Sequence, residues 1–171
     1  MRYREYRKSD FNALSSLYRS FYNEMRERQG WTWLKLDEKQ AEETAKQSLE
    51  NNSCIFVALD HQQLVGFVRV QLWDGAYFVR EVFVEKPFRR RNVGSRLLRK
   101  CENLVQQKGE TSLYLTVEPK HAVSIKYLIH NGYDTLNMLE LRKDLGKDDL
   151  PARQGEIDVL GHKLQLLKWN A

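Results

Sequence analysis

The sequence predicts an α/β (α+β) fold, in which a mixed, mostly antiparallel central sheet carries helices on both of its faces. Two observations support this prediction. Three apolar segments between residues 53 and 84 follow one another with only short turns between them, and short connections require antiparallel pairing. The next apolar segment, residues 113–117, comes only after a helical stretch, so we expect a crossover that places this strand parallel to a neighbour.

The first half of the chain is expected to supply one edge strand, two helices and the three antiparallel strands. A weakly alternating segment at residues 3–7 predicts the edge strand. Ser9 or Asp10 is a suitable N-cap for an amphipathic helix, and Asp37 begins a second helix that ends near residues 51–52. The three strands are expected at residues 53–59, 64–72 and 77–84, with turns between them.

The second half begins with another amphipathic helix. Its apolar stripe starts at about Asn92, and Gly109 closes it. Pro119 stops the strand at 113–117, and a short helix then ends at the Asn131–Gly132 pair.

Two further strand signals follow this short helix. Residues 136–141 predict a strand, and the segment from Glu156 to Trp169 predicts a hairpin turning at Gly161. We therefore expect one domain over residues 1–145, extended by a C-terminal β-hairpin within residues 146–171.

Composition indicates a soluble globular protein, because 42% of the residues are hydrophobic and 30% are charged. The longest apolar runs are far shorter than the roughly 20 residues that span a bilayer. Charges occupy the N-terminus where a signal peptide would have its apolar region. Cys54 and Cys101 show no metal-ligand spacing, so we expect neither a metal nor a disulfide. These features predict a cytoplasmic protein with no membrane partner.

The positive charge of the chain is concentrated in one short segment. The net charge is +5, but seven cations and no acid lie between Lys86 and Lys100. Outside this segment the chain holds 21 basic and 23 acidic residues. A nucleic-acid surface would usually spread its excess charge more widely, so this pattern favours one compact anion and no nucleic acid.

The anion is expected on the loop that joins the strand at 77–84 to the next helix. The first turn of a helix leaves its N–H groups unpaired and its positive dipole end exposed, which suits a phosphate. Gly94 allows close backbone approach, and Asn92 tolerates left-handed conformations. The predicted anion-binding residues are Arg89, Arg90, Arg91, Asn92, Val93, Gly94 and Ser95.

This loop resembles the coenzyme-binding motif of the GNAT superfamily of N-acetyltransferases. That motif is similar to Arg/Gln-x-x-Gly-x-Gly/Ala, and residues 89–94 match it with Asn92 in place of the first Gly. A second segment, residues 121–133, resembles Asn-x-x-Ala-x-x-Leu-Tyr-x-Lys-x-Gly-Phe and ends in Gly132-Tyr133. The resemblance covers most of the chain, roughly from Tyr3 to Leu141.

The resemblance implies an acetyl-CoA-dependent N-acetyltransferase that needs no metal. Backbone N–H groups at Phe83 and Val84, where that strand splays from the strand at 113–117, would bind the pantetheine arm. The backbone from Arg91 to Ser95 would bind the diphosphate. Arg89 and Arg90 would meet the outer phosphates.

The catalytic residues follow less directly from the sequence. Glu81 lies on the strand before the loop, where it could act as a general base, directly or through a water. It could equally be an ion-pair partner of Arg80 or of another neighbouring cation. Leu128 occupies the position at which the family often has its catalytic tyrosine. The adjacent Tyr127 is the nearest substitute for a general acid, although one helical step turns a side chain by about 100°.

We therefore predict transfer of an acetyl group from acetyl-CoA to a primary amine by direct attack in a ternary complex. The acceptor would be a small-molecule or peptide amine, and the terminal hairpin suggests a possible homodimer. Two alternatives remain. The chain could be a non-catalytic acyl-CoA-binding module of the same fold, which Leu128 makes conceivable, or a nucleic-acid-binding protein that uses the arginine cluster.

Overall fold

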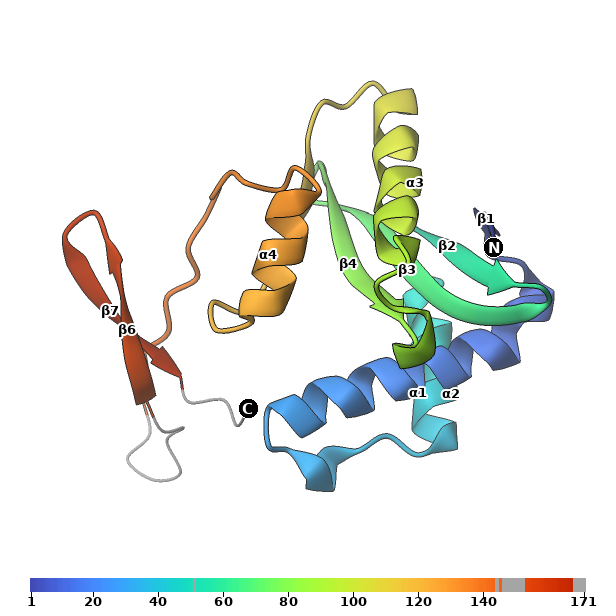
Figure 1. The fold of residues 1–171 in the computed structure, drawn as a ribbon, viewed down its shortest axis with the longest axis horizontal. Coiled ribbons are helices and arrows are strands. Elements are labelled where there is room, and N and C mark those ends of the chain that lie inside the picture. The colour runs from blue at the N-terminus through green and yellow to red at the C-terminus, as the bar shows by residue number, and fades with distance from the viewer. Residues whose placement is uncertain (51, 144, 146–152, 168–171) are drawn as a thin grey trace. The chain divides into compact units, whose positions relative to one another are not determined.

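The computed structural model describes residues 1–50, 52–143, 145 and 153–167 (Figure 1). The chain divides into two compact units, Met1–Thr116 and Val117–Ala171. The first unit contains the central sheet and three helices, and the second contains a helix and a hairpin. Within the described ranges, no helix is both long and apolar enough to cross a membrane.

The first unit is built on one five-stranded sheet in the order β1-β2-β3-β4-β5. All neighbours are antiparallel except β4 and β5, which are parallel and joined by the helical crossover predicted from the sequence. Two predicted strands shift: the edge strand expected at 3–7 and the last strand, expected at 113–117, which pairs over only three residues. The strands are β1 (Arg2–Glu5), β2 (Ser53–Asp60), β3 (Gln63–Trp73), β4 (Ala76–Val84) and β5 (Leu113–Leu115).

One face of the sheet is covered by α1 (Phe11–Arg28) and α2 (Glu38–Ser48). Leu14, Leu17 and Tyr18 of α1 are buried against β2, β3 and the Phe83 side chain of β4. The start of α2 follows the sequence prediction, because Asp37 and Gln40 form a reciprocal capping box. Three short 3₁₀ segments complete the connections: Lys8–Asp10, Thr32–Leu34 and Lys86–Phe88.

The opposite face is covered by α3 (Val93–Gln107), which contacts β2, β3 and β4. Its apolar stripe is fully buried at Leu97, Leu98 and Cys101. Because strand side chains alternate between faces, Val68 points toward α3 while Phe67 points toward α1. The predicted mixed sheet with helices on both faces is therefore confirmed.

The pairing of β3 with β4 depends on a glycine. Gly66 lies opposite Val84, and a Cβ atom at Gly66 would approach the Phe83 carbonyl oxygen to 2.7 Å. That separation is too short for a carbon–oxygen contact, so the two strands can approach this closely only at a residue without a side chain. Gly66 thereby fixes the backbone position of the last residues of β4.

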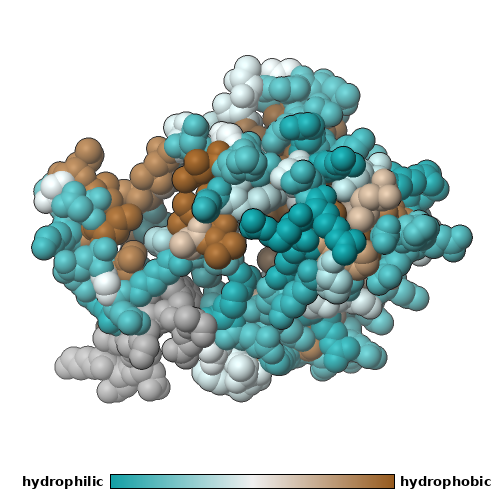
Figure 2. Space-filling model, in the orientation of Figure 1, coloured by the Kyte–Doolittle hydropathy of each residue, from teal (hydrophilic) through white to brown (hydrophobic). Residues whose placement is uncertain are grey.

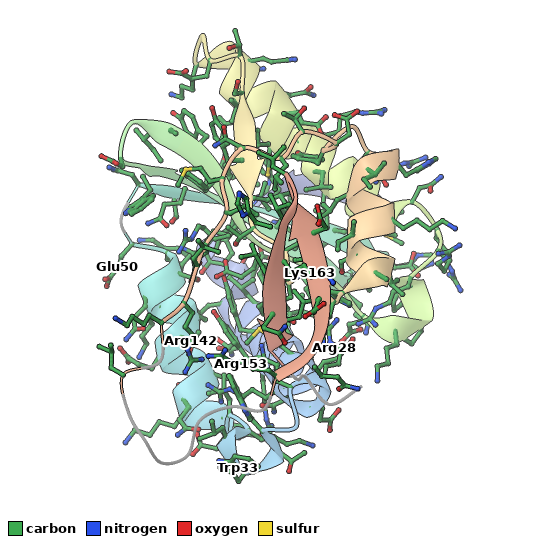
Figure 3. The ribbon with its side chains drawn as sticks, turned by 90° about the vertical axis from the view of Figure 1, so that its left-hand side faces the viewer. Arg28, Trp33, Glu50, Arg142, Arg153 and Lys163 are labelled. Carbon is green, nitrogen blue, oxygen red and sulfur yellow. The ribbon has the colours of Figure 1, made fainter. Side chains whose placement is uncertain are left out.

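The second unit contains α4 (Ala122–His130) and the antiparallel hairpin of β6 (Arg153–Val159) and β7 (His162–Leu167). The hairpin is predicted correctly in kind, and residues 168–169 of its expected range lie outside the described residues. It forms a separate two-stranded sheet. Lys163, labelled in Figure 3, lies on its second strand.

One predicted element of the second unit is wrong. Residues 136–141 form no strand, and Leu136, Met138 and Leu141 are exposed. An apolar pattern can mark a strand face, but a strand also needs a neighbouring edge for its backbone hydrogen bonds. Figure 2 shows hydrophobic side chains gathered on the visible face of this unit.

Candidate functional site

The edge of β4 is open along its second half. The ladder between β4 and β5 ends at Val79–Leu115, whereas β4 continues to Val84 and pairs there only with β3 among the described strands. The predicted splay of the two strands therefore begins after Val79.

The register shows which backbone groups face this open edge. The Glu85 N–H donates to the Val65 carbonyl at 2.9 Å, which makes Val84–Gly66 a non-hydrogen-bonded pair. The N–H and C=O of Val84 therefore point away from β3, and by alternation those of Val82 do too. Phe83, predicted to bind coenzyme through its backbone, instead pairs with Phe67, and its side chain is buried in the core.

The loop after β4 leads into a helix with free amino-terminal N–H groups. Arg90 and Asn92 both have left-handed backbones, with φ of 62° and 58°. The first α-helical bond of α3 runs from the Arg96 N–H to the Asn92 carbonyl, and the Asn92 side chain caps nothing. The N–H groups of residues 93–95 thus have no partner in the described parts of the chain. Free N–H groups at the positive end of a helix dipole are the kind of donors that suit an anion.

The arginine side chains of the loop divide into two groups. Arg89 is held within the protein: its Nε donates to the Val84 carbonyl at 2.7 Å, and its two Nη atoms bind the Glu24 carboxylate at 2.9 and 2.6 Å. Burial alone would raise the pKa of Glu24, but the Arg89 guanidinium outweighs burial and lowers it. Arg90 and Arg91 are exposed, and Arg91 lies over the Phe88 ring at 5.7 Å.

The sequence led us to expect Arg89 at the outer phosphates, whereas the structure holds its side chain against other residues of the protein. Its contacts tie the loop to α1 and to the last carbonyl of β4, and its guanidinium lies over the Phe83 ring at 5.5 Å. Of the three arginines at positions 89–91, Arg90 and Arg91 are the two that are exposed. Nothing in the local sequence pairs residue 89 with residue 24, which lies 65 positions earlier.

Glu81 is buried, with 7% of its surface exposed, and forms an ion pair. Arg69 on β3 donates from Nε at 2.5 Å and from Nη2 at 2.7 Å to the two carboxylate oxygens. The Tyr22 hydroxyl of α1 donates to the same carboxylate at 3.4 Å. The neighbouring cation that the sequence left open is therefore Arg69.

A bulge produces this pairing. From the Trp73–Ala76 pair to the Val70–Val79 pair the hairpin is regular, and continuing it would place Arg69 opposite Arg80. The register shifts by one residue at this point, so Arg69 pairs with Glu81 instead. Sequence reasoning could have found Arg69 only by predicting the bulge.

The family model for the acetyltransferase (GNAT) family matches residues 13–133. The chain belongs to this family. Curated proteins gave no significant match to the chain. The predicted family, fold class and enzyme class, an acetyl-CoA-dependent N-acetyltransferase, are confirmed.

Solved structures of N-acetyltransferases share the fold of this chain at low sequence identity. The aminoglycoside N-acetyltransferase AAC(6')-Iy in complex with CoA is 15% identical, with a TM-score of 0.65, over 85% of this chain and 95% of that chain. The aminoglycoside 6'-N-acetyltransferase AAC(6')-IG from Acinetobacter haemolyticus is 15% identical, with a TM-score of 0.63, over 85% and 100%. The PaiA N-acetyltransferase from Thermoplasma acidophilum, in complex with coenzyme A, is 16% identical, with a TM-score of 0.61, over 76% and 87%.

The second family segment forms α4 and its C-terminus. The Tyr133 N–H donates to the Leu128 carbonyl and the Gly132 N–H to the Ile129 carbonyl, both at 3.0 Å. This is a Schellman motif, and it requires the left-handed backbone that Gly132 adopts at φ 88°. In this chain the Gly132-Tyr133 pair therefore ends α4.

Tyr127 and Leu128 lie side by side in α4, but their side chains differ in exposure. Leu128 is buried, with 6% exposed, and Tyr127 is half-buried. Both belong to the second unit, whereas Glu81 and the loop belong to the first. Within the described ranges, no group of three or more His, Cys, Asp or Glu side chains is arranged to hold a metal ion.

Proposed function

We propose that this GNAT enzyme transfers the acetyl group of acetyl-CoA to the primary amine of a small molecule, by direct attack in a ternary complex. The observation that carries the proposal is the open edge of β4, which is followed after a short loop by the uncapped start of α3. The pantetheine arm of the coenzyme and the diphosphate that follows it require these two kinds of donor, one after the other along the chain.

The donor side of the reaction would use backbone groups. The outward N–H groups of Val82 and Val84 are suited to hydrogen bonds with the pantetheine amides and with the thioester carbonyl oxygen. The N–H groups of residues 93–95 would bind the diphosphate, with Arg90 and Arg91 neutralising its charge. The Val84 carbonyl already accepts a hydrogen bond from Arg89, and Arg89 thereby keeps the open edge of β4 in position.

The acceptor side would use Glu81. The amine must lose a proton to attack the carbonyl, and a carboxylate on the strand that holds the thioester can accept it, directly or through a water. Each Glu81 oxygen accepts one bond from Arg69, which leaves further acceptor capacity on both. Tyr127 is the proposed donor of a proton to the departing thiolate.

Turnover can be tested by following release of the coenzyme thiol with a panel of primary amines. Glu81→Gln should lower kcat by about 10²- to 10⁴-fold, the usual contribution of a general base, without weakening acetyl-CoA binding. Tyr127→Phe should lower kcat alone. If the chain binds acetyl-CoA and acetylates no amine, it is a binding module and the proposal is wrong.

A matched pair of charge variants tests the donor site. Arg91→Ala removes an exposed cation just before α3, and Arg99→Ala removes another exposed cation from the middle of that helix. We expect only Arg91→Ala to raise the Kd for acetyl-CoA by about tenfold, because charge-assisted bonds to phosphate act at short range. Equal effects of the two variants would mean that the arginines act only through their general field.

A further inference from the structure

A small polar cavity lies beside Glu81 on the α1 and α2 face of the sheet. Its volume is about 130 Å³, which is enough for a small polar group. Its lining residues are Tyr22, Thr44, Gln47, Ser48, Arg69 and Glu81.

The cavity is lined by one basic and one acidic side chain, Arg69 and Glu81. Although burial opposes the charge on Arg69, the Glu81 carboxylate raises the pKa of its guanidinium above the ordinary value. The other lining side chains are neutral, and Thr44 and Ser48 donate to backbone carbonyls of their own helix. The lining is therefore neutral in total, with its two charges adjacent.

Arg69 retains hydrogen-bonding capacity toward a ligand. Three of its five N–H groups are used: Nε and Nη2 bind Glu81, and Nη1 donates to the Ser53 hydroxyl at 3.2 Å. The two remaining N–H groups, one on each Nη atom, suit a carboxylate, whose two oxygens match the guanidinium fork. If a substrate carried a second positive group in place of the carboxylate, the Arg69 guanidinium would repel that group at low dielectric.

We propose that the acceptor of this enzyme is a small amine that also carries a carboxylate, with its amine near Glu81 and its carboxylate on Arg69. This assignment rests on the proposed function, since it takes Glu81 as the group that faces the amine. Arg69 is then a specificity-determining residue that selects zwitterionic amines and rejects polycations such as aminoglycosides.

The test compares matched acceptors at saturating acetyl-CoA: γ-aminobutyrate against butylamine, and β-alanine against propylamine, with spermidine as a polycation. We expect kcat/KM to be at least tenfold higher for the carboxylated member of each pair, mainly through a lower KM. Equal use of both members, or a preference for spermidine, would overturn the assignment.

Variants of Arg69 show whether this side chain sets the preference. Arg69→Gln should abolish the discrimination between the two members of a pair, and Arg69→Lys should keep part of it, because the charge remains and the fork is lost. Arg80→Gln removes an exposed cation from the residue before Glu81 on β4, and it should leave the discrimination between the two members of a pair unchanged. If Arg69→Gln does not fold, Arg69→Lys and the wild-type ratios still decide the outcome.

A binding measurement separates failure of this assignment from failure of the proposed function. Calorimetric titration of γ-aminobutyrate and butylamine into the CoA-loaded protein reports the cavity without turnover. Selective binding of γ-aminobutyrate with no acetyl transfer would overturn the enzymatic proposal and support the cavity assignment. Acetylation of plain amines with no effect of the carboxylate would support the enzyme and overturn the assignment.

Discussion

Replacement of Gly66 by alanine should damage both stability and coenzyme binding, because the added methyl group meets the backbone of β4. The new Cβ would lie 2.7 Å from the Phe83 carbonyl oxygen and 3.3 Å from the Val84 Cα. Relief of these contacts requires β4 to move by several tenths of an ångström. Overpacking of this kind costs about 1–3 kcal/mol.

Part of this cost is offset in the unfolded chain. Loss of the glycine's flexibility stabilises the folded state by about 0.4–1 kcal/mol where the backbone conformation is compatible. The net loss then lies between about 0 and 2.6 kcal/mol, and the middle of the two ranges gives about 1.3 kcal/mol. For a chain of this size this middle value corresponds to a melting temperature lowered by roughly 3–5 °C at about 2–4 °C per kcal/mol.

The functional effect follows from the same movement. Val84 presents its N–H to the open edge of β4, and its displacement should weaken one hydrogen bond to the coenzyme. A hydrogen bond contributes about 1 kcal/mol, so the Kd for acetyl-CoA should rise about fivefold. Calorimetric titration with acetyl-CoA and thermal denaturation measure the two effects.

Gly109→Ala provides the matched control. Gly109 ends α3 with φ of 84°, and a Cβ atom at this position would have no neighbour within 4 Å, so alanine there suffers only the left-handed penalty of about 1–2 kcal/mol. We expect this variant to lose stability without losing affinity for acetyl-CoA. Unchanged melting of Gly66→Ala, or equal affinity of both variants, would refute the reasoning.

Three further predictions concern charge and backbone. Arg90→Gly relieves the left-handed backbone, so the free energy of unfolding should rise by up to about 1 kcal/mol. The same variant should bind acetyl-CoA several-fold more weakly in a titration. A clear loss of stability would contradict this reasoning. Asp10 accepts hydrogen bonds from Arg4 at 2.6 and 2.8 Å, and Arg4 lowers the pKa of the Asp10 carboxyl group. The stability that this ion pair contributes is therefore present above the unfolded pKa of about 4, and it is lost as pH falls through the lower folded value. Asp10→Asn should cost about 3 kcal/mol at pH 7 in denaturant unfolding and less at pH 2, and a pH-independent loss would contradict the reasoning. Burial and Glu5 raise the pKa of Cys54 to about 12, and burial raises the pKa of Cys101. Iodoacetamide at pH 8 should therefore alkylate both cysteines at least about 100-fold more slowly in the folded protein than in urea. Rapid labelling of the folded chain would contradict this.

The sequence by itself determined the elements whose causes are local. Gly132 predicts the end of α4, since only its left-handed backbone completes the Schellman motif. The loop before α3 could be predicted for the same reason: a strand end, a cluster of cations and Gly94 lie within a few residues of one another. These features also carried the resemblance that identified the coenzyme.

The tertiary structure decided which partners these residues have. Arg89 binds Glu24, which lies 65 positions earlier in the sequence. The bulge at Arg80 places Glu81 opposite Arg69, where the two side chains form an ion pair. Both pairings depend on how the strands and α1 pack, because an ion pair needs atoms within a few ångströms and sequence spacing does not measure that distance. The strand wrongly predicted at 136–141 has the same explanation, since a pattern of side chains supplies no neighbouring edge for its backbone. Local chemistry thus predicted the donor site, and only the packed sheet placed a guanidinium beside the candidate base.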